Sequence, residues 1–283
     1  MIVVTGATGN VGRALVGQLA AERIPVRALT RDPARAHLPE GVETARLDPT
    51  EPASLAPLFT GASGLFLNLQ ATGAGGEHTA ALLEAARAGG VRHVVVLSSS
   101  IVGDGADETH PLYVAHAALE EAVREAGFDW TFLRPGAFAA NSLQWAAQIR
   151  AGDTVRGPFA DFAGNPIHEA DIAAVALRSF LDDTHRGAAH RLTGPEPVTH
   201  EETIRAIGRA IGRDLRFVEI PPEEVTPDIF PHVPPAILPE LLASFGEFVG
   251  RAPEITTTVE TVTGSPARTF EQWARDHKDD FRG

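Results

Sequence analysis

Three glycines spaced three residues apart stand near the start of the chain, in the stretch "TGATGNVG" over residues 5–12. The apolar run 2–4 precedes them, and a segment with apolar residues on one helical face follows. A strand, a tight glycine loop and a helix in this order favour binding of a pyrophosphate by free amides at the helix N-terminus. An ordinary turn between a strand and a helix is the alternative. The residues predicted to contact a dinucleotide here are Gly6, Thr8, Gly9, Asn10, Val11 and Gly12.

The end of the second predicted strand bears on which dinucleotide would bind. Sites for NAD commonly place an acidic residue there for the ribose hydroxyls, whereas sites for NADP offer an arginine to the 2′-phosphate. Arg31 and Asp32 both stand at this point, with Arg35 about one helical turn further on. We expect NADP(H) held by Arg31, and NAD(H) held by Asp32 is the less favoured alternative.

Short runs rich in β-branched residues alternate with helical patterns and must position these groups. The sequence predicts strands at 1–5, 25–31, 42–48, 64–69, 91–98, 129–134 and 190–195, and helices near 11–22, 52–59, 77–88, 112–126 and 167–183. This order predicts the α/β class, with a Rossmann-like doubly wound parallel sheet and a smaller C-terminal substrate lobe. The dinucleotide-binding domain is expected over 1–155, with 166–195 adding to it, and the lobe over 196–283.

A segment with seven prolines, residues 221–240, interrupts regular structure within the lobe. Its apolar residues Ile229, Phe230, Val233 and Ile237 favour a packed cap over a substrate site, and a solvated linker is the alternative.

Composition narrows the function classes. The 283 residues are 43% hydrophobic, contain no cysteine and carry a net charge of −13. Cysteine nucleophiles and cysteine–zinc sites are excluded, and we predict no metal site. The acidic balance argues against nucleic acid as a partner, since affinity for it depends on neutralising phosphates. We expect no membrane span and, because the chain opens directly on its first strand without a signal-like segment, a cytoplasmic location.

Several longer stretches resemble the NmrA-like branch of the atypical short-chain dehydrogenase/reductases: "VTGATGNVGRALV", "VRALTRDPARA", "HAALEEAVREAGFDWTFLRPGAFAAN", "IHEADIAAVA" and "LTGPEPVTHEETIRAIGRAIGR". The resemblance covers essentially the whole chain and implies an NAD(P)-binding fold whose members are either reductases or dinucleotide-binding regulators. It implies further cofactor contacts from Asp48, Pro135 and Phe138, and it places Asn141 toward the substrate pocket. Asn68, Leu69, Ser98 and Ser99 follow predicted strands at the carboxyl edge and are also expected at the cofactor; local hydrogen bonds and strand termination are the alternatives. Around the substrate we further expect Ser100, His168 and, from the proline-rich cap, Phe230. A turn role for Asp48 is an equal alternative.

The expected catalytic pattern departs from the wider superfamily, which pairs a serine with Tyr-x-x-x-Lys so that the lysine lowers the pKa of the tyrosine. The only tyrosine, Tyr113, is followed four residues later by Ala117, and the only lysine is Lys278. His116 shares a helical face with Tyr113, so these two are the predicted catalytic residues. A surface histidine paired with Glu120 and a tyrosine that fills the core are the alternatives.

Two functions of different class follow from these residues. The first is an NADPH-dependent reductase that delivers hydride to a small electron-poor acceptor such as a quinone, enone, imine or carbonyl. Such acceptors need little help from a strong acid, which fits the missing lysine. The second is a regulatory protein that senses NAD(P)(H) without turning it over. The sequence leaves the oligomeric state open.

Overall fold

The computed structural model describes residues 1–72, 76–103, 107–230, 233 and 235–282, and it divides into two compact units. Unit 1 comprises Met1–Gly136, Glu169–Leu192 and Thr258–Ser265; unit 2 comprises Ala137–His168, Thr193–Thr257 and Pro266–Gly283. The first boundary therefore lies at Gly136 rather than at residue 155. Trp145, Ile149 and Val155 explain this difference, because they are buried in the core of unit 2.

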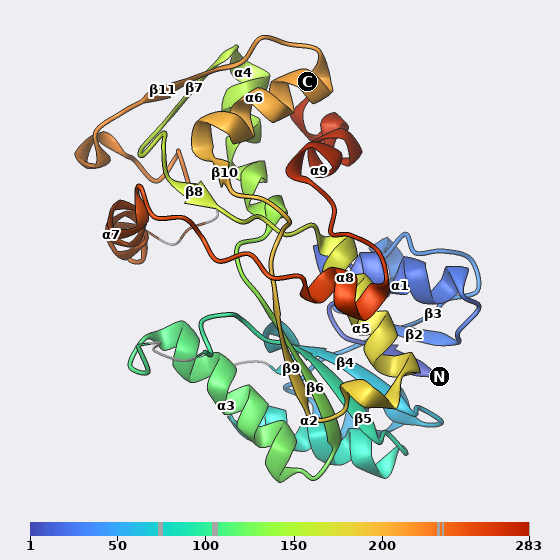
Figure 1. Cartoon of the computed structure of the whole chain (residues 1–283). Coiled ribbons are helices and arrows are strands. Elements are labelled where there is room, and N and C mark those ends of the chain that lie inside the picture. The colour runs from blue at the N-terminus through green and yellow to red at the C-terminus, as the bar shows by residue number, and fades with distance from the viewer. Residues whose placement is uncertain (73–75, 104–106, 231–232, 234, 283) are drawn as a thin grey trace. The chain divides into compact units, whose positions relative to one another are not determined.

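The sheet of unit 1 contains seven parallel strands in the order β3-β2-β1-β4-β5-β6-β9 (Figure 1). Its strands are β1 Ile2–Val4, β2 Val26–Thr30, β3 Glu43–Arg46, β4 Gly64–Asn68, β5 His93–Leu97, β6 Asp129–Pro135 and β9 Ala188–Leu192. The order reverses beside β1, which creates the switch point where open α/β sheets bind ligands. The predicted fold class is confirmed.

Helices cover both faces of this sheet. Its inner strands are nearly continuous apolar runs, because their side chains are buried on both faces. Val3, Leu65 and Val94 pack into one cluster with α2 (Gly76–Ala88) and α3 (Pro111–Glu125). Figure 1 shows these two helices on one side of the sheet and α1 (Asn10–Ala21), α5 (Glu169–Leu181) and α8 (Thr258–Thr263) on the other. On that second side the ring of Phe180 in α5 meets His93 edge-on, with 5.6 Å between ring centroids.

Two predicted elements of unit 1 differ from the structure. The helix expected over 52–59 is replaced by two 3₁₀ turns, η2 Pro52–Ser54 and η3 Ala56–Phe59, because the proline at 57 lacks the amide that a continuous helix needs there. The strand expected over 190–195 is β9 Ala188–Leu192, and it ends before Gly194, whose amide donates to the carbonyl of Asn165 within unit 2. The remaining short turns are η1 Pro33–Arg35, η4 Leu69–Thr72 and η6 Asp183–His185.

Unit 2 has its own apolar core and two small sheets, β10 with β8 and β11 with β7. Its strands are β7 Thr154–Gly157, β8 Ala163–Gly164, β10 Val198–Thr199 and β11 Arg216–Glu219. Its helices are α4 Ala146–Ala151, α6 His200–Ile211, α7 Leu238–Phe248 and α9 Phe270–Asp276, with 3₁₀ turns η5 Ala139–Trp145, η7 Pro222–Glu224 and η8 Lys278–Phe281.

The proline-rich segment contributes to this core. Phe230 is fully buried, and Ile229 and Val233 pack against the same cluster. This part of the segment is therefore packed into the core and is not a solvated linker. Ile237 differs from the expectation because it is 45% exposed. Of the prolines, those at 231 and 234 lie outside the described residues.

Candidate active site

The glycine loop of unit 1 is a tight turn whose shape depends on glycine at two positions. Gly6 has φ of +58°, a left-handed conformation that favours glycine, and a Cβ there would overlap the side chain of Asn68. A Cβ on Gly12 would overlap the backbone oxygen of Gly6, so the start of α1 can approach the loop only with glycine at this position. Gly9 differs from both, because its Cβ would meet only the oxygen of Gly6, at 3.3 Å. The side of the loop at Gly9 is therefore open.

The first turn of α1 has no side-chain cap and no acidic residue. In contrast, α6 and α9 of unit 2 both begin with a full capping box, formed by Thr199 with Glu202 and by Thr269 with Gln272. An uncapped helix start presents amide donors and a positive dipole end to an anion. The N-terminus of α1, at an open glycine, is thus suited to a phosphate group.

The ends of β1 and β4 are tied together beside this loop. The Thr5 hydroxyl donates to the Phe66 carbonyl at 2.9 Å and accepts from the Asn68 amide at 3.2 Å. The side-chain oxygen of Asn68 accepts from the amide of Ala71 at 3.1 Å. Asn68 therefore lies at the switch point next to Gly6, while Leu69, half-buried, begins the following turn.

The end of β2 carries an exposed arginine. The side chain of Arg31 makes no hydrogen bond or ion pair with the described residues, and neighbouring Asp32 precedes the turn η1. The hydroxyls of Thr8 and Thr30 lie 3.5 Å apart and link the glycine loop to this strand. Arg31 is thus placed at the carboxyl edge of the sheet with its guanidinium available to a ligand.

Asp48 follows β3 and is engaged in a local turn. Its carboxylate accepts from the Thr50 hydroxyl at 2.6 Å, the Thr50 amide at 3.1 Å and Arg46 at 3.2 Å. These hydrogen bonds to Thr50, with a smaller effect of Arg46, lower the pKa of Asp48 below its usual value. Of the two roles proposed for Asp48, the turn role is the one that its visible contacts support.

The three serines after β5 have different roles. Ser98 is 4% exposed, and its hydroxyl donates to Glu120 at 2.6 Å. The Ser99 hydroxyl accepts from the amide of Ile101 at 3.3 Å, and the Ser100 amide donates to the carbonyl of Pro135 at 2.9 Å. Ser99 and Ser100 are half-buried, so their hydroxyls are better placed for a ligand than that of Ser98.

Glu120 is the residue of this edge that sequence reasoning missed. It was considered only as a surface partner of His116, yet its side chain is 1% exposed and pairs with Arg134 of β6 at 2.6 Å. The apolar pattern of α3 could have indicated that Glu120 is buried, because Glu120 lies between the buried residues Leu119 and Val123.

Tyr113 and His116 both lie on α3 and are half-buried. The Nδ1 atom of His116 is buried and has no hydrogen-bond partner among the described residues. Burial lowers the pKa of His116 below its usual value, and the opposing charge of Glu120 offsets part of this effect. Burial therefore favours the neutral imidazole of His116, whose Nδ1 is unused among the described residues.

Comparisons with known proteins agree with this geometry. A model of the NAD(P)H-binding family matches residues 6–183. The chain belongs to this family. It is 36% identical to a (4-alkanoyl-5-oxo-2,5-dihydrofuran-3-yl)methyl phosphate reductase of Streptomyces griseus subsp. griseus, over 99% of each chain. It is also 33% identical to an NAD(P)H azoreductase of Xenophilus azovorans, over 98% of each.

Solved structures show the same fold. Citrobacter sp. triphenylmethane reductase complexed with NADP(H) matches 98% of this chain and 99% of its own, with a TM-score of 0.74 and 21% identity. NmrA, a negative transcriptional regulator in complex with NAD, matches 97% of this chain and 94% of its own, with a TM-score of 0.74 and 22% identity. The predicted NAD(P)H-binding family is thus confirmed; relatives that match the whole chain are named as reductases, and the chain shares its fold with NmrA.

The residues of unit 1 fit the cofactor of this NAD(P)H-binding family. The open side at Gly9 and the uncapped start of α1 form a cradle that a larger side chain would fill. The carboxyl edge beyond β1 and β4 leads on one side to Arg31 and on the other to the ends of β5 and β6.

Four predicted site residues of this NAD(P)H-binding protein lie in unit 2. Phe138 is half-buried, Asn141 is exposed, and the Nε2 atom of His168 lies 3.3 Å from Asp276. Phe230 is enclosed by Trp145 and Phe245, with ring centroids at 5.7 and 6.3 Å. Its full burial gives Phe230 a packing role, and the expectation that it lines a substrate site is not supported.

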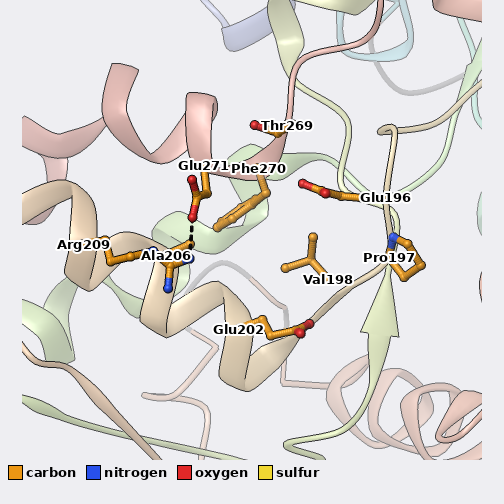
Figure 2. Close-up of a pocket in the computed structure, with 9 residues that line it drawn as sticks. All are labelled: Glu196, Pro197, Val198, Glu202, Ala206, Arg209, Thr269, Phe270 and Glu271. Carbon is orange, nitrogen blue, oxygen red and sulfur yellow. Dashed lines mark hydrogen bonds and ion pairs between the residues drawn. The ribbon is translucent and has the colours of Figure 1, made fainter.

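Unit 2 also contains a pocket of about 300 Å³ between one face of α6 and the start of α9 (Figure 2), lined by Glu196, Pro197, Val198, Glu202, Ala206, Arg209, Thr269, Phe270 and Glu271. Three of its charged groups are engaged, since Arg209 pairs with Glu271 at 2.6 Å and Glu202 caps α6. None of the predicted substrate residues lines it.

Neither a metal site nor a membrane-spanning helix is found in the described part of the chain. It contains no group of three or more histidine, aspartate or glutamate side chains arranged to hold a metal ion. Likewise, its helices include none with the length and apolar character needed to cross a membrane.

Proposed function

We propose that the chain is an NADPH-dependent reductase of small acceptors whose double bond is conjugated with a carbonyl group. The observation that carries this proposal is the pairing of an open glycine cradle with a helix, α3, that holds Tyr113 and His116 but has no lysine. Bound NADPH would supply a hydride. The chain itself would bind the cofactor, orient it and provide a weak proton donor.

Binding of the cofactor would rest on the first part of the edge. The amides at the start of α1 would hold the pyrophosphate, and Arg31 would favour NADPH over NADH through its guanidinium. Asn68, Ser99 and Pro135 lie along the same edge, toward the nicotinamide half. These assignments follow from the switch point beside β1.

The acceptor class is supported by the relatives and by the missing lysine together. The compound in the name of the Streptomyces relative is an unsaturated lactone that bears an alkanoyl group, so it is an electron-poor, conjugated acceptor. Conjugate addition of hydride forms an enolate, in which the negative charge is delocalised over oxygen and carbon. This step therefore needs less acid catalysis than reduction of an isolated ketone. His116, whose neutral form is favoured by burial, would donate a hydrogen bond to this oxygen through a ring N–H.

The test is NADPH consumption with a matched panel of acceptors. Purified protein is given an alkanoyl butenolide, a saturated lactone of the same size, a quinone and an azo dye, and the products are identified by mass spectrometry. The proposal expects turnover of the butenolide, with the ring C=C bond reduced, and none of the saturated lactone. If the protein rapidly reduces only the quinone or only the azo dye, the proposed acceptor class is wrong and the acceptor belongs to the class of the compound that is reduced.

The regulatory alternative is decided in the same experiment. A protein that only senses the dinucleotide would bind NADPH, as measured by calorimetry, and would turn over none of the acceptors. The likeness to NmrA makes this outcome worth measuring. Such a result would overturn the reductase proposal.

A further inference from the structure

The carboxylate of Glu120 is buried in unit 1 and accepts four hydrogen bonds. One oxygen accepts from the Ser98 hydroxyl at 2.6 Å and from Arg134 Nε at 2.9 Å. The other accepts from Arg134 Nη2 at 2.6 Å and from Arg124 Nη2 at 3.3 Å. Glu120 thus joins α3 to the residue that follows β5 and to Arg134 near the end of β6, and both of its oxygens are engaged.

Stability alone is a weak reason for this arrangement. Removing a carboxylate and a guanidinium from water costs free energy that their attraction only partly offsets, and apolar replacements of buried ion pairs are often as stable. The bidentate contact with Arg134 gives directional control instead, because a guanidinium fork fixes the plane of its partner. Backbone bonds at the same place, from Ser98 to Leu133 and from Ser100 to Pro135, keep the ends of β5 and β6 in register.

These strand ends border the nicotinamide half of the site. The pyrophosphate belongs at the start of α1, beside β1, and the adenosine half extends toward β2, where Arg31 stands. The nicotinamide half must therefore extend the other way, past β4 toward the ends of β5 and β6. Ser99 and Ser100 directly follow the residue that Glu120 holds.

We propose that Glu120 is a positioning residue for the nicotinamide half of the cofactor. It acts through Ser98 and Arg134, which set the segments 98–100 and 134–136 at the edge of the sheet. This proposal rests on the proposed function, since it assumes a bound dinucleotide. Glu120 does not act through a hydrogen bond to His116, because the buried Nδ1 of His116 has no partner among the described residues.

The test compares Glu120→Gln with Glu121→Gln, the same change one residue further along α3. Glu121 is exposed and contacts Arg124 at 3.1 Å, so it controls for the lost charge and for the helix. Two probes separate the halves of the site: 2′,5′-ADP contains only the adenosine half, and NADPH fluorescence reports how firmly the nicotinamide is held. Neither readout requires turnover.

We expect Glu120→Gln to weaken NADPH binding about 10-fold and to shorten the fluorescence lifetime of bound NADPH, because one charge-assisted network is lost. Affinity for 2′,5′-ADP should stay within about 2-fold of the wild type, since the adenosine half is unchanged. Glu121→Gln should match the wild type with both probes. Unchanged NADPH binding and lifetime in Glu120→Gln, or equal losses of both probes, would overturn the proposal.

A second variant covers the case in which Glu120→Gln does not fold. Glu120→Met combined with Arg134→Met replaces the pair by apolar groups of similar length and should remain folded. If this folded variant holds the nicotinamide as the wild type does, the network has no positioning role. Absence of turnover in the wild type would contradict the proposed function but leave these binding measurements valid.

Discussion

The two halves of the carboxyl edge of unit 1 are built on different principles. Near β1 and β2, the backbone shapes the site: Gly6 adopts a left-handed conformation, Gly12 allows close packing and α1 begins without a cap. Near β5 and β6, side chains shape it, through a buried carboxylate shared by Ser98 and Arg134. The glycine half should therefore tolerate almost no side chain, whereas the α3 half should respond in graded steps to changes in charge and hydrogen bonding.

Gly9→Val gives the largest expected effect and tests the glycine half. A branched side chain on the open side of the loop would occupy the space of the pyrophosphate, so NADPH binding should be lost. The fold should persist, because a Cβ at this position meets only the Gly6 oxygen, at 3.3 Å. Calorimetric titration and a thermal unfolding curve measure the two effects separately.

Gly17→Val is the matched control, since a Cβ at Gly17 in α1 would meet no described atom within 4 Å beyond its chain neighbours and the backbone of its own helix. It should bind NADPH as the wild type does. If Gly9→Val also binds NADPH normally, the loop is an ordinary turn and the proposed cradle is wrong.

His116→Ala tests the α3 half at its proposed hydrogen-bond donor. For an isolated carbonyl acceptor, whose developing oxyanion carries a localised charge, kcat should fall about 100-fold, the usual range for loss of one donor to an oxyanion. For a conjugated acceptor the loss should be below about 10-fold, because its charge is delocalised. Steady-state kinetics with both acceptors give the ratio.

Tyr113→Phe supplies the control for packing, since it keeps the ring and removes only the hydroxyl. Full activity of both His116→Ala and Tyr113→Phe on every acceptor would mean that the proton comes from solvent. The α3 half would then act through positioning alone.

Arg31→Ala tests cofactor choice in the glycine half. Loss of a charged contact to the 2′-phosphate should weaken NADPH about 30-fold and leave NADH within about 2-fold. Arg92→Ala removes the same charge at the opposite, amino end of β5, where the residue is exposed, and should change neither affinity. Equal losses for both cofactors in Arg31→Ala would assign the selectivity to another residue.

His93→Gln gives the smallest expected effect and leaves both halves of the edge untouched. Burial lowers the pKa of His93 to about 4, and its Nε2 lies 3.0 Å from the Thr131 hydroxyl. Because the unfolded chain binds a proton near pH 6.5 and the folded chain does not, stability should fall as the pH drops from about 6.5 toward 4. Between pH 7 and pH 5 this residue should contribute about 1 to 2 kcal/mol of that loss.

Urea unfolding at pH 7 and pH 5 measures this contribution. His93→Gln keeps a donor near Thr131 but does not titrate, so its free energy of unfolding should change less over this range than that of the wild type. An equal change in both proteins would show that other buried histidines, such as His200, account for the pH dependence.

Local sequence patterns predicted the fold and the tight glycine loop, because both depend on neighbouring residues. The alternating strands gave the parallel sheet, and glycines at fixed spacing gave the loop. The buried pairing of Glu120 was missed because it joins residues 14 and 22 positions apart, and a lone glutamate on a helix is usually solvated. Phe230 was assigned to a substrate site because apolar residues that line a pocket and those that fill a core have the same composition.

The path of the chain through unit 1 has a consequence for its synthesis. The strands β1 to β6 are complete by residue 135, but β9 and α5 come from residues 169–192, and α8, which packs on both, follows only at 258–263. A ribosome must therefore translate two segments of unit 2 before the last helix of the dinucleotide-binding unit emerges. During that interval the parts of α5 and β9 that α8 covers in the folded unit remain without this partner.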